Sequence, residues 1–182
     1  AITCGCWVKN VGLRGAGAGL LRDLAQLRQV VERVVGCTDL PVTVKTRLGW
    51  DAESIRIVEV ARMLEDLGVQ GLTIHCRTRS QGHKGEVDYA WIPRVKEAVS
   101  MPVVLNGDVV SAEGVENAFA TTGCDGVMIG RGAIRHPWIF REARHFLESG
   151  ESLPEPTLRE RVDLCMEHLE LAVEHGGERY GL

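Results

Sequence analysis

The sequence predicts an α/β protein: the C-terminal five βα units of a (β/α)8 TIM barrel, followed by the start of a helical domain. Short apolar, β-branched segments recur one βα unit apart, helical patterns lie between them, and each apolar segment ends in polar or charged residues. The last observation favours a barrel, which gathers side chains from many strand ends. An open doubly wound sheet, the competing architecture, concentrates them at one switch point.

Four segments are expected to be strands: "PVTVKTR" from Pro41, "GLTIHCRT" from Gly71, "MPVVLNGD" from Met101 and "DGVMIGRG" from Asp125. Their apolar residues continue without polar alternation, which is typical of strands buried on both faces. The opening "AIT" is expected to end one more strand. A complete barrel needs roughly 250 residues, so we expect the first three strands to be absent. The open strand edges should make the isolated chain fold poorly or dimerise.

Helical spacing appears in two of the intervening segments. Apolar residues three and four apart predict helices over residues 20–35 and 55–67, and Gly68 stands where a left-handed C-cap is expected. Ser111 is the expected N-cap of a helix that continues to residue 122. After the proline-containing joint "LPEPT", the sequence "LRERVDLCMEHLELAVEHGG" predicts an amphipathic helix. We therefore assign residues 1–150 to the barrel and 151–182 to the start of a helical domain.

Composition narrows the functional classes. The net charge of −4 provides no overall basic field for nucleic acid, so any such contact requires a local patch. No apolar run approaches the roughly 20 residues that span a bilayer, and we expect no membrane partner. The six cysteines are scattered through apolar segments, which predicts a reducing, cytoplasmic compartment.

Two turns at successive strand ends predict an anion site: Asn106-Gly107-Asp108 and Gly130-Arg131-Gly132. In barrels, the loops after the last two strands commonly bind phosphate. Glycine lets the backbone approach the anion, and Arg131 can add a bidentate contact. One such turn alone would be typical of a tight βα connection with a solvated arginine. Two in tandem favour the phosphate site.

Lys45 lies within an otherwise apolar strand, so its ammonium group needs a partner or a cavity. In a barrel mouth it suits a flavin ring or a substrate carbonyl, and the alternative is a lysine that reaches water from the strand end. His75 and Arg77 fall on one side of their strand by two-residue alternation. They could bind phosphate or polarise a carbonyl, although a lone histidine at a strand end is more often structural.

Cys4 and Cys6 raise the question of a metal site. No second pair of cysteine or histidine ligands occurs at zinc spacing, so we expect no metal. A cysteine at the end of a barrel strand, near Lys9 and a glycine-rich turn, can instead serve as a general acid. Cys4 is expected to point away or to pack inside, which makes Cys6 the candidate catalytic residue.

Several longer stretches carry a family resemblance: "GCWVKNV" with "GAGAGLL", "PVTVKTRLGW", "LTIHCRTRSQGHKGEVDY", "IPRVKEAVSMPVVLNGD", "TTGCDGVMIGRGAIRHPWIFRE" and "LESGESLP". In this order and spacing they resemble the tRNA-dihydrouridine synthases, most nearly the bacterial B-type branch, truncated at both ends. The resemblance covers essentially the whole chain. Two positions depart from it, since Thr3 stands where the family usually has Asn and Trp7 where it usually has Pro.

The resemblance implies FMN as cofactor, NADPH as reductant and tRNA as partner. Hydride would pass to C6 of a flipped-out uracil while Cys6 protonates C5. Residues 1–150 would then bind flavin, and residues 151–182 would begin a tRNA-binding domain. The implied cofactor-binding residues are Lys45, His75, Asn106, Gly107, Asp108, Gly130 and Arg131.

Two local clusters of basic side chains favour an RNA contact despite the acidic net charge. One contains Arg77, Arg79, His83 and Lys84, and the other Arg135, His136, Arg141, Arg144 and His145. The candidate RNA-binding residues are Arg77, Arg79, Lys84 and Arg135, and the alternative is a set of solvated surface charges.

The leading hypothesis is therefore an FMN-dependent oxidoreductase that reduces specific tRNA uridines to dihydrouridine. Two alternatives remain open at this stage. One is a related FMN barrel that reduces a free small molecule, and the other is a non-catalytic remnant that binds tRNA without reducing it.

Overall fold

The computed structural model describes residues 1–177 and contains one parallel five-stranded sheet. The strands are β1 (Ile2–Thr3), β2 (Val44–Arg47), β3 (Leu72–His75), β4 (Val103–Asn106) and β5 (Gly126–Met128). Their order in the sheet follows their order in the sequence. This arrangement confirms the five predicted strands and their parallel pairing.

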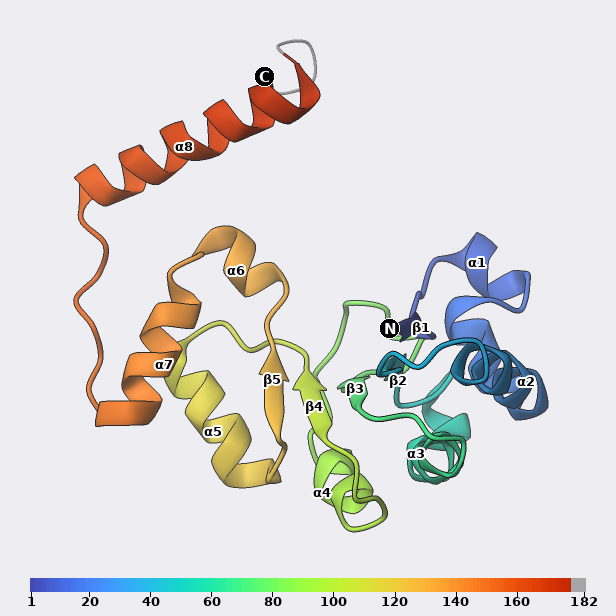
Figure 1. Cartoon of the computed structure of the whole chain (residues 1–182). Coiled ribbons are helices and arrows are strands. Elements are labelled where there is room, and N and C mark those ends of the chain that lie inside the picture. Colours follow the sequence, from blue (N-terminus) through green and yellow to red (C-terminus); the bar gives the residue numbers. More distant parts are fainter. Residues whose placement is uncertain (178–182) are drawn as a thin grey trace.

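Helices connect the strands and cover the convex side of the curved sheet (Figure 1). The helices are α1 (Lys9–Leu13), α2 (Leu24–Val35), α3 (Ile57–Asp66), α4 (Trp91–Lys96), α5 (Ala112–Thr122), α6 (Arg131–Arg135), α7 (Ile139–Ser149) and α8 (Leu158–Gly176), with 3-10 turns at Gly17–Arg22 and Ala52–Ser54. The covering layer consists of α2 to α5 and α7, whereas α1 and α6 lie at the upper edge and α8 lies apart from the sheet. Sequential parallel strands with a helix layer on one side are the arrangement of a partial (β/α)8 barrel, as predicted.

Burial is not uniform along the strands. In β4, Val103 and Leu105 are fully buried, whereas Val104 and Asn106 are partly exposed, and β2 and β3 likewise have a partly exposed second residue. In β4, Val103 and Leu105 face the helices and form part of the core, whereas Val104 and Asn106 face the concave side. The expectation of strands buried on both faces is therefore wrong for these partly exposed residues, whereas Arg47 and His75 at the ends of β2 and β3 are buried beneath loops.

Helix ends follow local signals in part. The Ser111 hydroxyl accepts a hydrogen bond from the Gly114 N–H at 3.0 Å, and Gly68 is left-handed directly after α3, as predicted. The helix predicted over residues 20–35 begins only at Leu24. The Asp23 carboxylate accepts from the Gln26 N–H at 3.0 Å and caps it there, so the leucines before it lie in a 3-10 turn.

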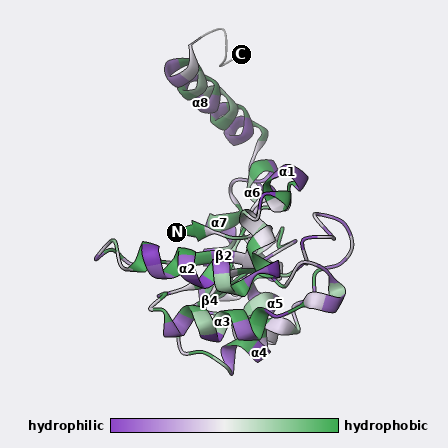
Figure 2. Cartoon of the chain, turned by 90° about the vertical axis from the view of Figure 1, so that its right-hand side faces the viewer, coloured by the Kyte–Doolittle hydropathy of each residue, from purple (hydrophilic) through white to green (hydrophobic). Residues whose placement is uncertain are grey.

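The predicted C-terminal helix is α8, which begins with a capping box between Thr157 and Glu160. None of its residues is buried, and it extends away from the sheet in Figures 1 and 2. Purple and green residues both occur along it in Figure 2, as the amphipathic pattern predicted. The boundary at residue 150 stays a prediction, and the last five residues of the expected helical domain, 178–182, lie outside the described part of the chain.

Across residues 1–177, no helix is both long and apolar enough to span a membrane.

Ile74 provides a test of the core. It is fully buried in β3, whereas Ile134 is 84% exposed in α6. Ile74→Val should lower the free energy of unfolding by about 0.5–1.5 kcal/mol, because it removes a packed methyl group. The matched change Ile134→Val should alter it by less than about 0.5 kcal/mol. Urea denaturation measures both, and equal effects would contradict the assignment of this strand face to the core.

Candidate functional site

The polar strand ends form one row across the concave side of the sheet. Arg47 is the register partner of His75, and His75 is the partner of Asn106. Lys45 lies two residues before Arg47 and therefore shares its face of β2. Three side chains singled out from the sequence, Lys45, His75 and Asn106, thus come from three adjacent strands and lie with Arg47 toward the carboxyl edge.

Arg47 connects this row to the loops above it. Its guanidinium is 2% exposed and donates to three backbone carbonyls: Gly5 at 2.9 Å, Thr78 at 3.0 Å and Gly82 at 2.8 Å. Burial and the neighbouring Arg77 lower the pKa of Arg47 to about 10, so the guanidinium keeps its charge at neutral pH. The side chain therefore holds the loop after β1 against the loop after β3.

Cys6 lies in the first of these loops, beside Arg47, and its thiol is free and partly exposed. The glycine-rich turn that follows packs directly on it. Gly17 has φ +55°, and a Cβ there would stand 2.8 Å from the Cys6 Cβ, so no side chain fits. Cys4 is fully buried, and burial raises the pKa of its thiol to about 11. These positions agree with the predicted contrast between a packed Cys4 and an available Cys6.

An aromatic contact links the Cys6 loop to the loop after β3. The rings of Trp7 and His83 meet edge to face, with centroids 5.3 Å apart, and the His83 ring lies 5.9 Å from that of His75. Trp7 remains 43% exposed beside Cys6. The indole that replaces the expected proline thus packs between the candidate thiol and the basic loop.

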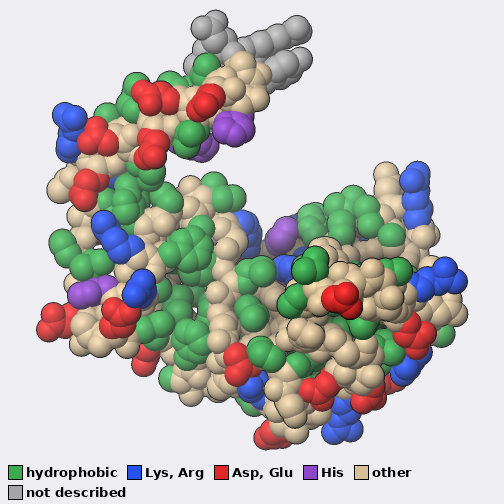
Figure 3. Space-filling model, viewed as in Figure 1, with side chains coloured by type: hydrophobic (Ala, Val, Ile, Leu, Met, Phe, Trp, Pro, Cys, Tyr) green, Lys and Arg blue, Asp and Glu red, His purple; other side chains and the backbone are tan. Residues whose placement is uncertain are grey.

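The site holds more positive than negative charge. Burial and then Arg47, Lys45, Arg77 and His83 lower the pKa of His75 to about 3, so this imidazole is neutral at physiological pH. Burial, followed by Arg47, lowers the pKa of Lys45. Figure 3 shows Lys, Arg and His side chains at the base of the hollow in the upper edge of the molecule. This excess of cations suits an anionic ligand.

The turn after β4 has an unusual backbone. Gly107 has φ +137°, and a Cβ there would stand 2.8 Å from Val87 Cγ1, while Asp108 has φ +51° and is the one non-glycine residue with positive φ in the described chain. The Tyr89 hydroxyl donates to the Gly107 carbonyl. The Asn106 amide donates to the Met128 carbonyl of β5 at 2.8 Å, which joins this turn to the next strand.

Asp108 brings the two predicted anion-binding turns together. Its carboxylate accepts from both terminal nitrogens of Arg77 and from Arg131 Nη2 at 3.0 Å. The hydrogen bond from Arg77, with further contributions from the charges of Arg77 and Arg131, holds the pKa of the Asp108 carboxyl below its usual range. The turns after β4 and β5 therefore lie side by side, as the tandem pattern predicted.

Arg77 differs from its expected place in an exposed basic loop. Its side chain is 2% exposed, and its donors end on Asp108 and on the Gly85 carbonyl at 2.6 and 3.2 Å. An arginine buried against a carboxylate is not available at the surface, so we no longer include Arg77 among the RNA contacts. The sequence did not show this, because Asp108 is far away along the chain.

Gly130 and Gly132, in the turn after β5, have different surroundings. Gly130 faces open space, whereas Gly132 packs so closely on residues 109–110 that a Cβ would stand 3.0 Å from the Val109 carbonyl. Gly132 therefore serves packing, not approach to an anion as predicted. Helix α6 begins within this turn, at Arg131, and is only five residues long.

The remaining candidate RNA contacts lie in the loop after β3, which contains Arg79 and Lys84, and at the end of α6, which is Arg135. Lys84 and Arg135 are exposed. Arg79 is partly exposed and stacks on the Trp50 ring, with its Cζ 4.4 Å from the ring centroid. The sequence did not predict that Arg79 stacks on Trp50, or that Arg47 holds two loops together by hydrogen bonds. For Arg47 a signal existed, because it follows Lys45 by two residues on the same strand face.

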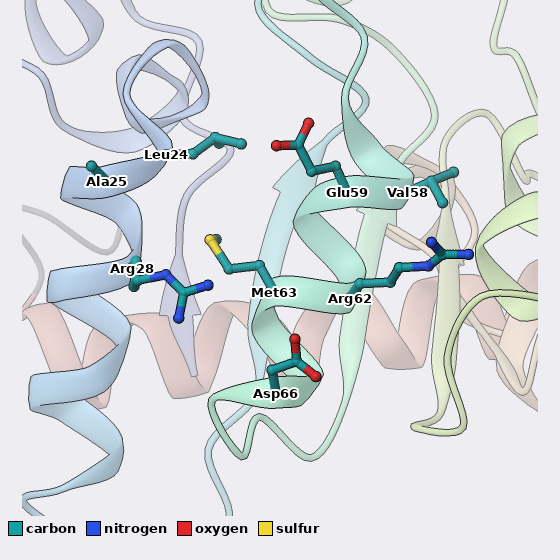
Figure 4. Close-up of a pocket in the computed structure, with 8 residues that line it drawn as sticks. All are labelled: Leu24, Ala25, Arg28, Val58, Glu59, Arg62, Met63 and Asp66. Atoms are coloured by element: carbon teal, nitrogen blue, oxygen red, sulfur yellow. The ribbon is translucent and has the colours of Figure 1, made fainter.

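A groove elsewhere on the molecule contains none of the candidate catalytic or cofactor-binding side chains. It has a volume of about 690 Å³ and lies between α2 and α3 in the outer helix layer (Figure 4). Two of its charged residues pair along their own helices, Arg28 with Glu32 at 3.6 Å and Glu59 with Arg56 at 2.6 Å. Among residues 1–177 no group of three His, Cys, Asp or Glu side chains is arranged to hold a metal ion.

Comparison with known proteins decides the family. The profile of the family described as "Dihydrouridine synthase (Dus)" matches residues 1–182. The chain belongs to the dihydrouridine synthase family. It is 45% identical over 168 residues to tRNA-dihydrouridine synthase B of Pseudomonas putida, covering 92% of this chain and 50% of that protein. The enzyme of the same name from Vibrio vulnificus is 41% identical over 180 residues, which cover 99% of this chain and 56% of that protein.

The family resemblance stated from the sequence is thereby confirmed. The chain spans about half the length of the curated relatives that it matches. Among solved structures, a protein of Burkholderia cenocepacia described as a candidate phosphonomutase superposes with a TM-score of 0.56 at 22% identity. The match covers 92% of this chain and 81% of that one, which supports the fold.

The lowered pKa of His75 predicts how the free energy of unfolding of this chain depends on pH. The folded state keeps the imidazole neutral down to about pH 3, whereas the unfolded chain binds a proton below its ordinary pKa of 6.5. Stability should therefore fall as the pH drops through this window, by up to about 1.4 kcal/mol per pH unit. His75→Gln should flatten the dependence in urea denaturation between pH 7 and pH 4.

Exposed His168 on α8 provides the matched control, and His168→Gln should leave the slope unchanged. A wild-type slope retained in His75→Gln would show that the imidazole is not held neutral.

Proposed function

We propose that this chain is part of an FMN-dependent oxidoreductase that reduces the C5=C6 bond of uridines in tRNA to give dihydrouridine. The observation that carries the proposal is the meeting of a free, accessible thiol with a cationic row at one edge of the sheet, in a chain of the dihydrouridine synthase family. The relatives named tRNA-dihydrouridine synthase B support the same reaction.

The residues at this edge fit a flavin phosphate. Lys45, Arg47, Arg77 and Arg131 supply positive charge here, and the Asp108 carboxylate is already shared between the guanidiniums of Arg77 and Arg131. Gly107 is buried and has no room for a side chain, since a Cβ there would stand 2.8 Å from Val87 Cγ1, and Asp108 directly after it is exposed. Lys45, His75, Asn106, Gly107, Asp108, Gly130 and Arg131 are the residues that we assign to holding FMN.

When bound, FMN supplies the hydride that saturates the C5=C6 bond, and NADPH is the reductant that we assign to its reloading. The Cys6 thiol donates a proton to C5 of the uracil. Arg47 keeps the Cys6 loop in place through Gly5, so the proton donor stays at the edge of the sheet.

A stacked uracil cannot lie flat in such a site, so the target nucleotide must leave the RNA helix. Exposed Lys84 and Arg135, together with the partly exposed Arg79, are the side chains that we assign to the RNA backbone. All six cysteines, which lie within the described residues, are free, and this supports a reducing compartment. We assign the protein to the cytoplasm.

The central test uses the purified protein expressed from its complete gene. The preparation should be yellow from bound flavin. Cys6→Ala should reduce dihydrouridine formation by about 10²-fold or more while flavin absorbance is retained, because it removes a proton donor and not a flavin ligand. Mass spectrometry of tRNA nucleosides measures the product.

Cys37→Ala, a change at an exposed cysteine, should leave turnover unchanged. Turnover that survives Cys6→Ala would assign the proton to another group. A colourless preparation would favour the non-catalytic tRNA-binding alternative, and a yellow one that reduces free pyrimidines but not tRNA would favour the small-molecule reductase.

The RNA contact is tested by substitution at Lys84 and Arg135. Each change to alanine should weaken tRNA binding and reduce the slope of log K against log salt by about 0.7–0.9, because each removes one phosphate contact. Arg79 is avoided, since its loss would also expose Trp50. Arg28→Ala, in the outer helix layer, is the matched control. Unchanged affinity and slope for both variants would remove these side chains from the interface.

A further inference from the structure

Asp108 lies between two arginines that differ sharply in exposure. Arg77 behind it is 2% exposed, Arg131 in front of it is 62% exposed, and the Asp108 side chain is 39% exposed. One carboxylate oxygen, Oδ1, accepts from Arg77 Nη1 at 2.9 Å and from Arg131 Nη2 at 3.0 Å. The other, Oδ2, accepts from Arg77 Nη2.

The carboxylate is fixed from behind. Arg77 binds it with both terminal nitrogens and is itself anchored on the Gly85 carbonyl through Nε and Nη2. The Asp108 backbone adopts a left-handed conformation, φ +51°, which is uncommon for residues other than glycine. A strained conformation persists where its surroundings determine it, and the buried bidentate pair does so here.

Among the described residues, the Arg131 side chain is held only by Asp108. Its pair with Asp108 uses one Nη2, and no other side-chain hydrogen bond of Arg131 occurs among the described residues. A guanidinium has five N–H donors, so the remaining ones are free to bind an anion. A carboxylate repels an anion, and direct contact between Asp108 and a phosphate would therefore be unfavourable.

We propose that Asp108 is a positioning residue, which holds Arg131 toward the phosphate monoester of the flavin without itself touching that phosphate. This inference rests on the proposed function and changes the role that we expected for Asp108, from a cofactor ligand to the support of one. It makes a specific claim: the carboxylate matters for the phosphate and not for the ring of the flavin.

The experiment compares FMN with riboflavin, which has the same ring and no phosphate, by the quenching of flavin fluorescence on binding. Asp108→Asn should weaken FMN binding about tenfold or more, as expected for loss of a charge-assisted hydrogen bond. Riboflavin binding should change less than about threefold. In an Arg131→Ala background, Asp108→Asn should have little additional effect, because the residue to be positioned is gone.

The matched control is Asp125→Asn. Asp125 is also an ion-paired aspartate, with Lys96 at 2.6 Å, but it lies at the opposite end of β5. Equal losses of FMN and riboflavin affinity in Asp108→Asn would overturn the proposal, and so would a full effect in the Arg131→Ala background. Should Asp108→Asn fail to fold because Arg77 is left without its carboxylate, Asp108→Glu keeps the charge but displaces it, and the same FMN-selective loss is expected.

A flavin-free readout separates this proposal from the proposed function. The ¹⁵N order parameter of the Arg131 Nε–H group should fall in Asp108→Asn and stay unchanged in Asp125→Asn. Wild-type protein that binds no flavin, together with this fall, would overturn the proposed function and leave the positioning of Arg131 established. An unchanged order parameter in Asp108→Asn would overturn the positioning role whatever the flavin does.

Discussion

The guanidinium of Arg47 is buried and has no carboxylate partner among residues 1–177, and the arrangement of the carboxyl edge depends on how its charge is satisfied. Three carbonyl oxygens, from Gly5, Thr78 and Gly82, accept its hydrogen bonds. Hydrogen bonds to a charged group contribute about 1.5–3 kcal/mol each, which offsets a desolvation cost of several kcal/mol. A lysine could not replace it, since a single ammonium lacks the planar fork that reaches separate loops. The loop of the thiol and the loop after β3 are thereby fixed to one strand.

Electrostatics explains why this edge suits a negatively charged partner despite the acidic net charge of the chain. The acidic residues that pair with cations elsewhere, such as Glu32 and Glu59, lie in the outer helix layer. At the carboxyl edge, the Asp108 carboxylate is shared between two arginines, and burial, followed by the neighbouring cations, lowers the pKa of His75. The charge distribution is therefore local, and the net charge of −4 does not reveal it.

Local sequence patterns predicted what depends on local physics. The five strands, the Ser111 cap and the left-handed Gly68 follow from residue type and spacing within a few positions. The start of α2 was misplaced because the apolar periodicity continues through a 3-10 turn, and only the Asp23 cap marks the helix. The burial of Arg77 was missed because its partner, Asp108, lies on the next strand end, and pairing between such distant residues leaves no periodic signal. The roles of the individual site residues remain predictions.

The edge-to-face contact of Trp7 with His83 joins two loops that are far apart in the sequence. Gly82 packs against the same indole so closely that a Cβ there would stand 3.2 Å from it. His83 directly precedes Lys84, while Trp7 directly follows Cys6. The loop of Lys84 therefore packs directly on the residue next to the thiol, so a single indole connects the candidate RNA-binding loop with the candidate proton donor.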